Sequence, residues 1–157
     1  MKVDELMTRK VTTCRPDDTL ERAARFMWDG DCGSLPVCDH ENHVVGMITD
    51  RDICMAALFA GKALNELPVY LSMAKQVLIC NAEQDISTVE KSMREKRVRR
   101  VPVVDAQGAL VGIIGLADLA REAASERAAA DKDVTESEVG DTLAAICEPP
   151  AKRRRAA

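Results

Sequence analysis

The residues best suited to bind a ligand lie where a predicted strand runs directly into a predicted helix. They form the pattern Gly46-x-x-Thr49-x-x-Asp52. A glycine permits a close approach to the backbone, and the free N–H groups of a helix start favour an anion. An ionised Asp52 can accept both hydroxyls of a ribose, and Thr49 can donate to a phosphate oxygen or to the sugar. The pattern therefore predicts a site for a ligand with a sugar and an anionic group.

The same spacing has an explanation that needs no ligand. Thr49 and Asp52 also match a capping box, in which the two side chains satisfy the first N–H groups of a helix. Capping boxes are far commoner than ligand sites, so the four residues from Thr49 to Asp52, taken alone, favour the structural interpretation. The two roles can coexist, because a carboxylate held at a helix start is already oriented for a partner.

An internal repeat gives this pattern its context. Leu35-Pro36-Val37 corresponds to Val101-Pro102-Val103, and 102 − 36 gives an offset of 66 residues. At this offset, without a gap, identical residues recur in eight further pairs: Met7 and Met73, Val11 and Val77, Cys14 and Cys80, Met27 and Met93, Asp39 and Asp105, Gly46 and Gly112, Ile48 and Ile114, Asp52 and Asp118. Chance does not keep register that long, so the chain contains a duplicated unit.

Each unit is predicted to have the order β-α-β-β-α. The expected elements are 11–13, 18–28, 35–38, 44–48 and 50–59, then 77–79, 85–96, 100–104, 110–114 and a helix from 116. The periodicity of apolar residues and the turn residues between them support this order. Asp18, followed by Glu21, is expected to cap the first helix. A three-stranded sheet with helices on one face needs cover elsewhere, so we expect an α/β fold in which both units pack around a pseudo-twofold axis.

The order of elements and two segments carry a family resemblance. Leu35-Pro36-Val37 and Val45-Gly46-Met47-Ile48-Thr49-Asp50-Arg51-Asp52-Ile53 resemble the CBS domain. The paired copies, over roughly residues 3–122, resemble a Bateman module. The resemblance implies a stand-alone regulatory or sensor module with no required cofactor. Because the sequence offers no nucleophile–base–orienter set, no phosphate loop of the P-loop type and no metal cluster, we do not expect an enzyme. The resemblance also implies an adenosyl ligand such as AMP or ATP between the repeats, a homodimer formed through helices of both repeats, and a regulated partner protein. The alternative is an interaction or scaffold protein with vestigial clefts.

The resemblance also implies which residues form the site. These are Gly46, Thr49, Asp50 and Asp52 from the first repeat, and Val77, Arg97, Arg99, Arg100 and Asp118 from the second. Arg99 and Arg100 stand where basic residues of the family face the phosphates of a ligand. Cations at a helix end are also favoured by the helix dipole, so a solvated helix end remains the alternative.

The two predicted clefts are unequal. Gly115 stands in the second repeat where Thr49 stands in the first, so that copy keeps Asp118 and loses a hydroxyl. The segment 29–34, which is the counterpart of the basic segment before Val101, contains no cation. Both differences make the Asp52 cleft the better candidate.

Composition excludes several classes of function. Only 3% of the 157 residues are aromatic and the net charge is −4, so we expect no surface that stacks on bases or binds nucleic acid. No apolar run has the length of a membrane span, and the charged N-terminus does not match a secretory signal. We therefore expect a cytoplasmic protein with reduced cysteines and no membrane partner.

Two further groups of residues contain side chains that can bind metals or react with oxidants. Cys38, His40 and His43 could be drawn as zinc ligands, but the second copy fills the same stretch with an ordinary polar turn and no fourth ligand is evident, so no metal is expected. The pair Cys14 and Cys80 suggests packing at the ends of buried strands, not redox chemistry.

The chain is expected to divide into three parts. Residues 1–62 form the first repeat with the N-terminal segment, 63–124 the second repeat with the linker, and 125–157 a helical, partly flexible tail. Within the tail, residues 134–147 are expected to hold one short helix, with Val139, Leu143 and Ile146 on one side. The basic end 152–155 is most simply a solvated tail.

Overall fold

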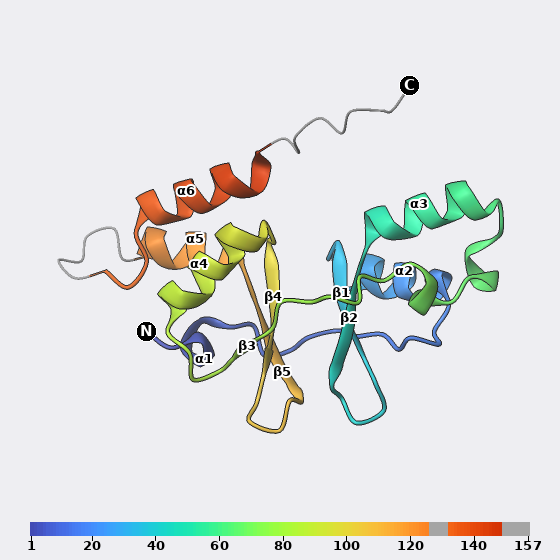
Figure 1. Cartoon of the computed structure of the whole chain (residues 1–157), viewed down its shortest axis with the longest axis horizontal. Helices are drawn as coiled ribbons and strands as arrows, with labels where there is room; N and C mark the ends of the chain where they lie inside the picture. Colours follow the sequence, from blue (N-terminus) through green and yellow to red (C-terminus); the bar gives the residue numbers. More distant parts are fainter. Residues whose placement is uncertain (126–131, 149–157) are drawn as a thin grey trace.

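The two halves of the chain each contain an antiparallel hairpin flanked by helices, as the computed structural model shows for residues 1–125 and 132–148. The elements are α1 (Val3–Leu6), α2 (Leu20–Asp29), β1 (Ser34–Cys38), β2 (Val44–Thr49), α3 (Asp50–Ala60), β3 (Cys80–Asn81), α4 (Ile86–Lys96), β4 (Arg100–Val104), β5 (Leu110–Gly115), α5 (Leu116–Ser125) and α6 (Glu136–Cys147). Figure 1 shows the hairpins side by side in the middle, with α2 and α3 at one end and α4, α5 and α6 at the other. The predicted α/β class and its repeated units are confirmed.

The hairpins match in detail. β1 pairs with β2 and β4 pairs with β5, and both ladders shift register at the same place, after Val37 and after Val103. Those positions differ by the repeat offset, since 37 + 66 = 103. Cys14 forms a parallel bridge to Val37, and Cys80 at the start of β3 pairs in parallel with Val103. The duplicated sequence therefore produces a duplicated backbone.

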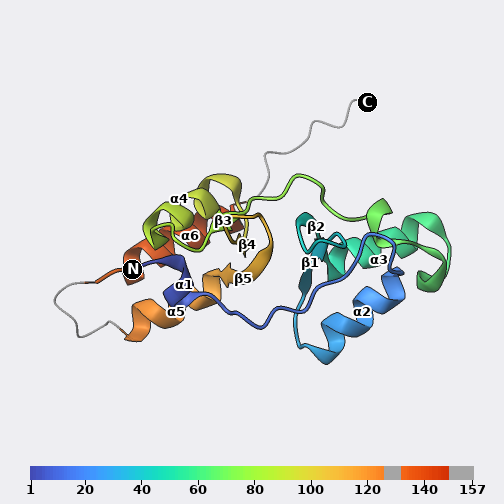
Figure 2. The same ribbon diagram turned by 90° about the horizontal axis from the view of Figure 1, so that it is seen from below.

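The predicted strands 11–13 and 77–79 are wrong. Within the described residues, the first is reduced to the single bridge at Cys14, and the second begins only at Cys80. Each segment crosses between the two halves of the molecule. Thr8 pairs with Ile113 of the second repeat before the chain reaches Cys14, and Ala74 pairs with Met47 of the first repeat before the chain reaches Cys80. A segment that spans two sheets cannot pair continuously with either. Figure 2 shows both crossings.

Packing therefore exchanges two segments between the repeats. Val3 and Met7 are buried in the core of the second repeat. Leu67 and Val69, from the linker after α3, are buried in the core of the first repeat. The N-terminal segment thus belongs by sequence position to one repeat and by burial to the other, which ties the two halves together.

Gly46 and Gly112 make this exchange possible. A Cβ atom on Gly46 would lie 2.7 Å from Sδ of Met73 and 3.0 Å from the carbonyl oxygen of Ala74. A Cβ on Gly112 would lie 2.5 Å from Sδ of Met7. The close approach that we expected at Gly46 is therefore made by the protein's own chain, because the exchanged segment runs directly over each glycine.

The helix caps agree only in part with the sequence prediction. Asp18 does not cap α2; its carboxylate instead accepts from the N–H of Arg15 at 2.7 Å and pairs with Arg22. Thr19 is the cap, accepting from the N–H of Arg22 at 3.2 Å. Thr19 caps the helix because its hydroxyl lies next to the first free N–H groups. The carboxylate of Asp18 instead stabilises the turn that precedes the helix. The cap of α3 at Thr49 is as predicted.

α6 covers the outer face of α4 and α5. Val139 packs against the core of the second repeat, whereas Leu143 is exposed and Thr142 is buried. The expected short helix is present as α6, and its buried Thr142 meets the polar side chains of Glu90 and Arg94 of α4. Residues 126–131 and the basic end 152–155 lie outside the described residues. Among the described helices, none is long and apolar enough to cross a membrane.

Candidate ligand-binding cleft

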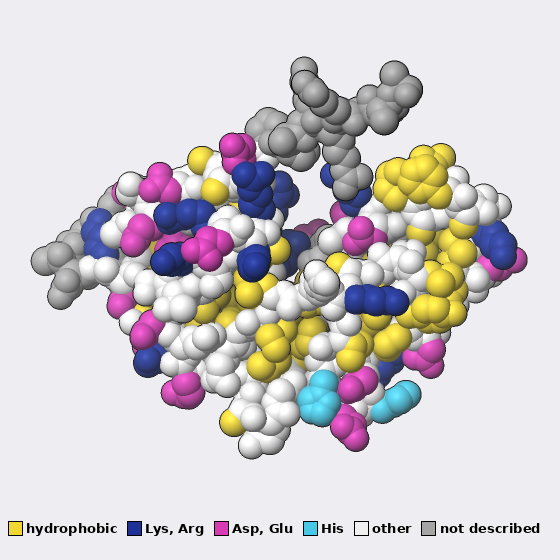
Figure 3. Space-filling view, viewed as in Figure 1, with side chains coloured by type: hydrophobic (Ala, Val, Ile, Leu, Met, Phe, Trp, Pro, Cys, Tyr) yellow, Lys and Arg dark blue, Asp and Glu magenta, His cyan; other side chains and the backbone are white. Residues whose placement is uncertain are grey.

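A cleft of about 750 Å³ lies between the two repeats. The first repeat contributes the junction between β2 and α3, and the second contributes the segment before β3 and the start of β4. Its lining residues are Gly33, Ser34, Met47, Thr49, Asp50, Arg51, Ala74, Gln76, Val77, Leu78, Arg97, Val98, Arg99 and Arg100. Figure 3 shows Lys and Arg side chains at the hollow between the two halves. The volume is in the range of sites for small organic ligands.

Six of the nine predicted site residues line this cleft. They are Thr49, Asp50, Val77, Arg97, Arg99 and Arg100. Gly46, Asp52 and Asp118 are not among the described residues that line it. Gly46 is covered by Met73, as described above. The sequence therefore identified both walls of the cleft from the two repeats.

Asp52 lies directly behind Thr49 and is bonded to it. Oδ2 of Asp52 accepts from the backbone N–H of Thr49 at 2.9 Å and from its hydroxyl at 2.7 Å. The N–H of Asp52 donates to the hydroxyl oxygen at 3.1 Å. The capping box is thus formed, and it uses the hydroxyl proton that we expected a phosphate to accept. In the part of the chain that the structure describes, Oδ1 of Asp52 has no hydrogen-bond partner, so one carboxylate oxygen is left to accept from a ligand.

The counterpart in the second repeat is fully occupied. Oδ2 of Asp118 accepts from the N–H of Gly115 at 2.7 Å, and Oδ1 pairs with Arg121. Asp118 is also buried. The position that corresponds to Arg121 in the first repeat is Met55, since 55 + 66 = 121, so Asp52 has no equivalent cation. The predicted inequality of the two aspartates thus has a second cause that the sequence reasoning missed.

The basic wall of the cleft comes from the second repeat. Nη1 of Arg100 donates to the hydroxyl of Ser34 at 3.1 Å, which places this guanidinium across the junction of the repeats. Arg97 ends α4 in the left-handed conformation, with a φ of 55°, and pairs with Glu148 just after α6. The carbonyl of Arg99 accepts from the N–H of Leu116, so its backbone is fixed by α5.

The charge of the lining favours an anion. Among the described residues, four arginines line the cleft, namely Arg51, Arg97, Arg99 and Arg100, against the single carboxylate of Asp50. Oδ1 of Asp50 accepts from the N–H of Arg51 at 2.7 Å, at the start of α3. Cations gathered around a hollow raise the local concentration of anionic ligands. Arg51 was not predicted as a site residue, although it stands inside the segment that carries the resemblance.

Ser34 was also missed. Its small hydroxyl gives no signal by itself in the sequence. The repeat could have found it, because 34 + 66 = 100 makes Ser34 the counterpart of Arg100. Gln76 and Leu78 flank the predicted Val77 and line the cleft with it.

Among the residues that the structure describes, the cysteines and histidines do not gather into a metal site. Burial raises the pKa of Cys14 to about 12 and that of Cys80 to about 11, so both thiols stay protonated at neutral pH, which supports the packing interpretation. Cys38 is buried, whereas His40 is exposed on the turn. Within residues 1–125 and 132–148, no group of three or more potential metal ligands is close enough to hold an ion.

Comparison with known proteins gives a consistent result. The chain matches the CBS domain family over residues 3–58 and 65–125. It is 33% identical over 147 residues to hypoxic response protein 1 of Mycobacterium tuberculosis (strain H37Rv), covering 94% of each chain. The crystal structure of Hypoxic Response Protein I with two coordinated zinc ions is similar, with a TM-score of 0.70 and 35% identity, over 77% of this chain and 98% of that one.

A second solved structure, the CBS domain pair of protein MJ0100 in complex with 5'-methylthioadenosine and S-adenosyl-L-methionine, has a TM-score of 0.69 and 25% identity, over 77% of this chain and 98% of that one. The family match falls on both sequence repeats, and the similar structures share the paired arrangement. The chain therefore belongs to the CBS domain family and carries two CBS repeats.

Proposed function

We propose that this protein is a non-catalytic cytoplasmic sensor that binds an adenosine nucleotide, AMP or ATP, in the cleft between its CBS repeats. The observation that carries the proposal is the pairing of two walls. The β2–α3 junction, with Thr49 in the lining and Asp52 behind it, faces arginines of the second repeat. A carboxylate with one unused oxygen suits ribose hydroxyls, and the guanidinium groups suit phosphate oxygens.

The arginines favour a phosphorylated ligand. The similar CBS pair of MJ0100 is bound to 5'-methylthioadenosine and S-adenosyl-L-methionine, which supports an adenosyl ligand here. Neither compound carries a phosphate, and the second has a positively charged sulfonium. A lining with four arginines and one carboxylate repels a cation and attracts an anion. AMP and ATP therefore suit this cleft better than the ligands of that relative.

Occupancy of the cleft is proposed to alter how the protein meets a regulated partner. The cleft is built from both repeats, so a ligand that contacts Thr49 and Arg100 together stabilises one arrangement of the two halves. In the same proposal the protein acts as a homodimer.

A scaffold with empty clefts is the second candidate function. One observation favours it: Thr49 and Asp52 already satisfy each other through three hydrogen bonds, so the pattern has a complete structural use. The unused Oδ1 of Asp52 and the gathered arginines favour the sensor.

A thermal-shift titration of the purified protein separates the two. AMP, ADP and ATP should each raise the melting temperature, by several degrees at saturation, because a ligand that binds only the folded state stabilises it by mass action. S-adenosylmethionine and NAD serve as comparison ligands, and adenosine as the control without phosphate. A melting temperature that no nucleotide shifts, up to millimolar concentration, would support the scaffold and contradict the sensor.

A further inference from the structure

α6 is held on the second repeat by three residues of α4 and its end. Thr142 of α6 is fully buried, and its hydroxyl donates to Oε1 of Glu90 at 2.9 Å and accepts from Nε of Arg94 at 3.3 Å. Arg97, the residue that ends α4, pairs with Glu148 just after α6. Positions 90, 94 and 97 follow one another at helical spacing, so they lie along one side of α4. The middle and the end of α6 are therefore bound to the helix that leads into the basic wall of the cleft.

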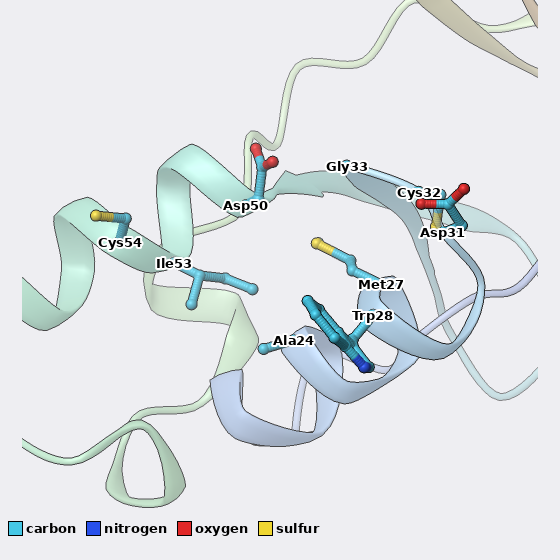
Figure 4. A pocket seen from close by; sticks show the side chains of 9 residues that line it. All are labelled: Ala24, Met27, Trp28, Asp31, Cys32, Gly33, Asp50, Ile53 and Cys54. Atoms are coloured by element: carbon cyan, nitrogen blue, oxygen red, sulfur yellow. The ribbon is translucent and has the colours of Figure 1, made fainter.

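The first repeat carries different residues at the three equivalent positions. Since 24 + 66 = 90, 28 + 66 = 94 and 31 + 66 = 97, the counterparts are an alkyl group, an indole and a carboxylate, namely Ala24, Trp28 and Asp31. All three line a hollow of about 470 Å³ between α2 and α3. Figure 4 shows this hollow, with Ile53 extending from α3 toward Trp28 of α2. The polar residues under α6 thus depart from the repeat, which indicates that the docking of α6 is a specific feature of the second repeat.

The two halves of α6 are held differently. Val134, just before the helix, is fully buried, and Val139 packs against the core of the second repeat. Of residues 143–148, all of which the structure describes, none is buried. The paired side chains of Arg97 and Glu148 are 48% and 60% exposed. The end of α6 therefore depends on polar contact more than on apolar burial, and an exposed ion pair is worth only a factor of up to about five in an equilibrium.

Arg97 belongs to the α6 contact and to the cleft at the same time. Its side chain lines the cleft together with Arg99 and Arg100. Its backbone has a φ of 55°, and its N–H donates to the carbonyl of Arg94 at 3.3 Å, so the backbone is fixed and only the side chain can change partners. A phosphate carries up to two charges and several acceptor oxygens, and a contact of this kind is worth about tenfold or more in affinity. A phosphate in the cleft is therefore expected to take Arg97 from Glu148.

We propose that a nucleotide phosphate displaces Glu148 from Arg97 and thereby frees the last turns of α6, residues 143–148, from α4. The inference rests on the proposed function, because it requires a nucleotide in the cleft. The buried Thr142 keeps the preceding part of the helix docked, so the change is confined to its end. Because that end is exposed, its release makes the occupancy of the cleft recognisable to a partner protein. By linkage, the docked end of α6 lowers the affinity for the nucleotide by the same factor.

Amide hydrogen exchange followed by NMR tests the proposal residue by residue. Saturating ATP should speed the exchange of the amides of residues 143–148 about two- to fivefold, the range of an exposed ion pair. The amides of residues 139–142 should be unchanged. Adenosine, which has no phosphate, should leave both segments as they are.

Two variants make the test specific to the ion pair. Glu148→Gln should show the faster exchange of residues 143–148 without any ligand, and ATP should add nothing to it. Asp141→Asn is the matched control, because it neutralises an exposed carboxylate on the same helix. It should behave as the wild-type protein does, with and without ATP.

Three results would overturn the proposal: unchanged exchange of residues 143–148 when ATP is bound, unchanged exchange in ligand-free Glu148→Gln, or an Asp141→Asn variant that exchanges as fast as Glu148→Gln. Isothermal titration of ATP into the same samples separates this proposal from the proposed function. ATP that binds without changing the end of α6 contradicts the release of α6 alone. Absence of ATP binding contradicts both the nucleotide sensor and the release that depends on it.

Discussion

Arg100 donates a hydrogen bond to Ser34 at 3.1 Å, and the two residues occupy equivalent positions of the two repeats. A contact between equivalent positions places the pair close to the pseudo-twofold axis. The duplicated backbone thus presents the same position twice, once as a cation and once as a small hydroxyl. Together with Arg97 and Arg99, whose counterparts are Asp31 and Gly33, this difference gives the cleft one basic wall and makes its two sides chemically distinct.

The basic wall predicts a selective loss of affinity for phosphorylated ligands. Replacing Arg99 and Arg100 together with Ala should weaken AMP and ATP by at least about tenfold, since a hydrogen bond to a charged group contributes about 1.5–3 kcal/mol. Adenosine, which has no phosphate, should lose little. Competition binding with all three ligands measures this, and Lys62→Ala, which removes an exposed cation outside the cleft lining, is the control. An equal loss for adenosine and ATP would point to a folding defect and count against the phosphate contact.

Neutralising Glu148 is expected to have the opposite effect and to raise the affinity for phosphorylated ligands. Its carboxylate pairs with Arg97, which lines the cleft. The carboxylate of Glu148 and the phosphate of a ligand therefore compete for the guanidinium of Arg97. Glu148→Gln should raise the affinity for ATP by up to about fivefold, the range of an exposed ion pair, and leave adenosine unchanged. A titration at low and high salt will show the gain fading as salt rises. Unchanged or weaker ATP binding at low salt would exclude Arg97 from the phosphate contact.

The close packing of the exchanged segments over Gly46 and Gly112 predicts that a side chain at either position lowers the stability of the protein. Gly46→Ala and Gly112→Ala should each cost about 1–3 kcal/mol, because the added Cβ meets Met73 or Met7 and the backbone behind them. Gly140→Ala is the control: nothing lies within 4 Å of its Cβ position, and alanine favours the helix, so α6 should gain about 0.5–1 kcal/mol. Urea unfolding measures all three. If Gly46→Ala and Gly112→Ala are as stable as the wild type, the segments do not pack over the glycines in solution.

Much of the fold could be predicted from the sequence. The helices α3 and α4 begin and end within a residue or two of their predicted bounds, because a capping box at Thr49 marks α3 and the apolar period of Ile86, Val89 and Met93 marks α4. The short strands near Val11 and Val77 could not be predicted correctly. Their neighbours in space come from the other repeat, and no local pattern records that Thr8 and Ala74 pair across the molecule.

The candidate site, too, could be predicted only in part from the sequence. Thr49 and Arg100 carry a signal, because a capping box and a basic run stand out in a sequence. The pairing of Asp118 with Arg121 does not, since it depends on the rotamers of two side chains of one helix, one of them buried and the other exposed. Likewise, Trp28 gives no sign in the sequence that its face stays bare while the equivalent face is covered by α6.

Isothermal titration of ATP into the wild-type protein, Asp52→Ala and Asp118→Ala tests the central claim most directly. The wild type should bind one ATP per chain. Asp52→Ala should lose about tenfold or more in affinity for ATP. The substitution removes the unused Oδ1 and also the Oδ2 atom that holds the Thr49 side chain in its position at the cleft. Asp118→Ala breaks the pair with Arg121 and should reduce stability, yet bind ATP almost as the wild type does. If Asp118→Ala abolishes binding while Asp52→Ala retains it, the nucleotide does not occupy the cleft at Thr49 and Asp52.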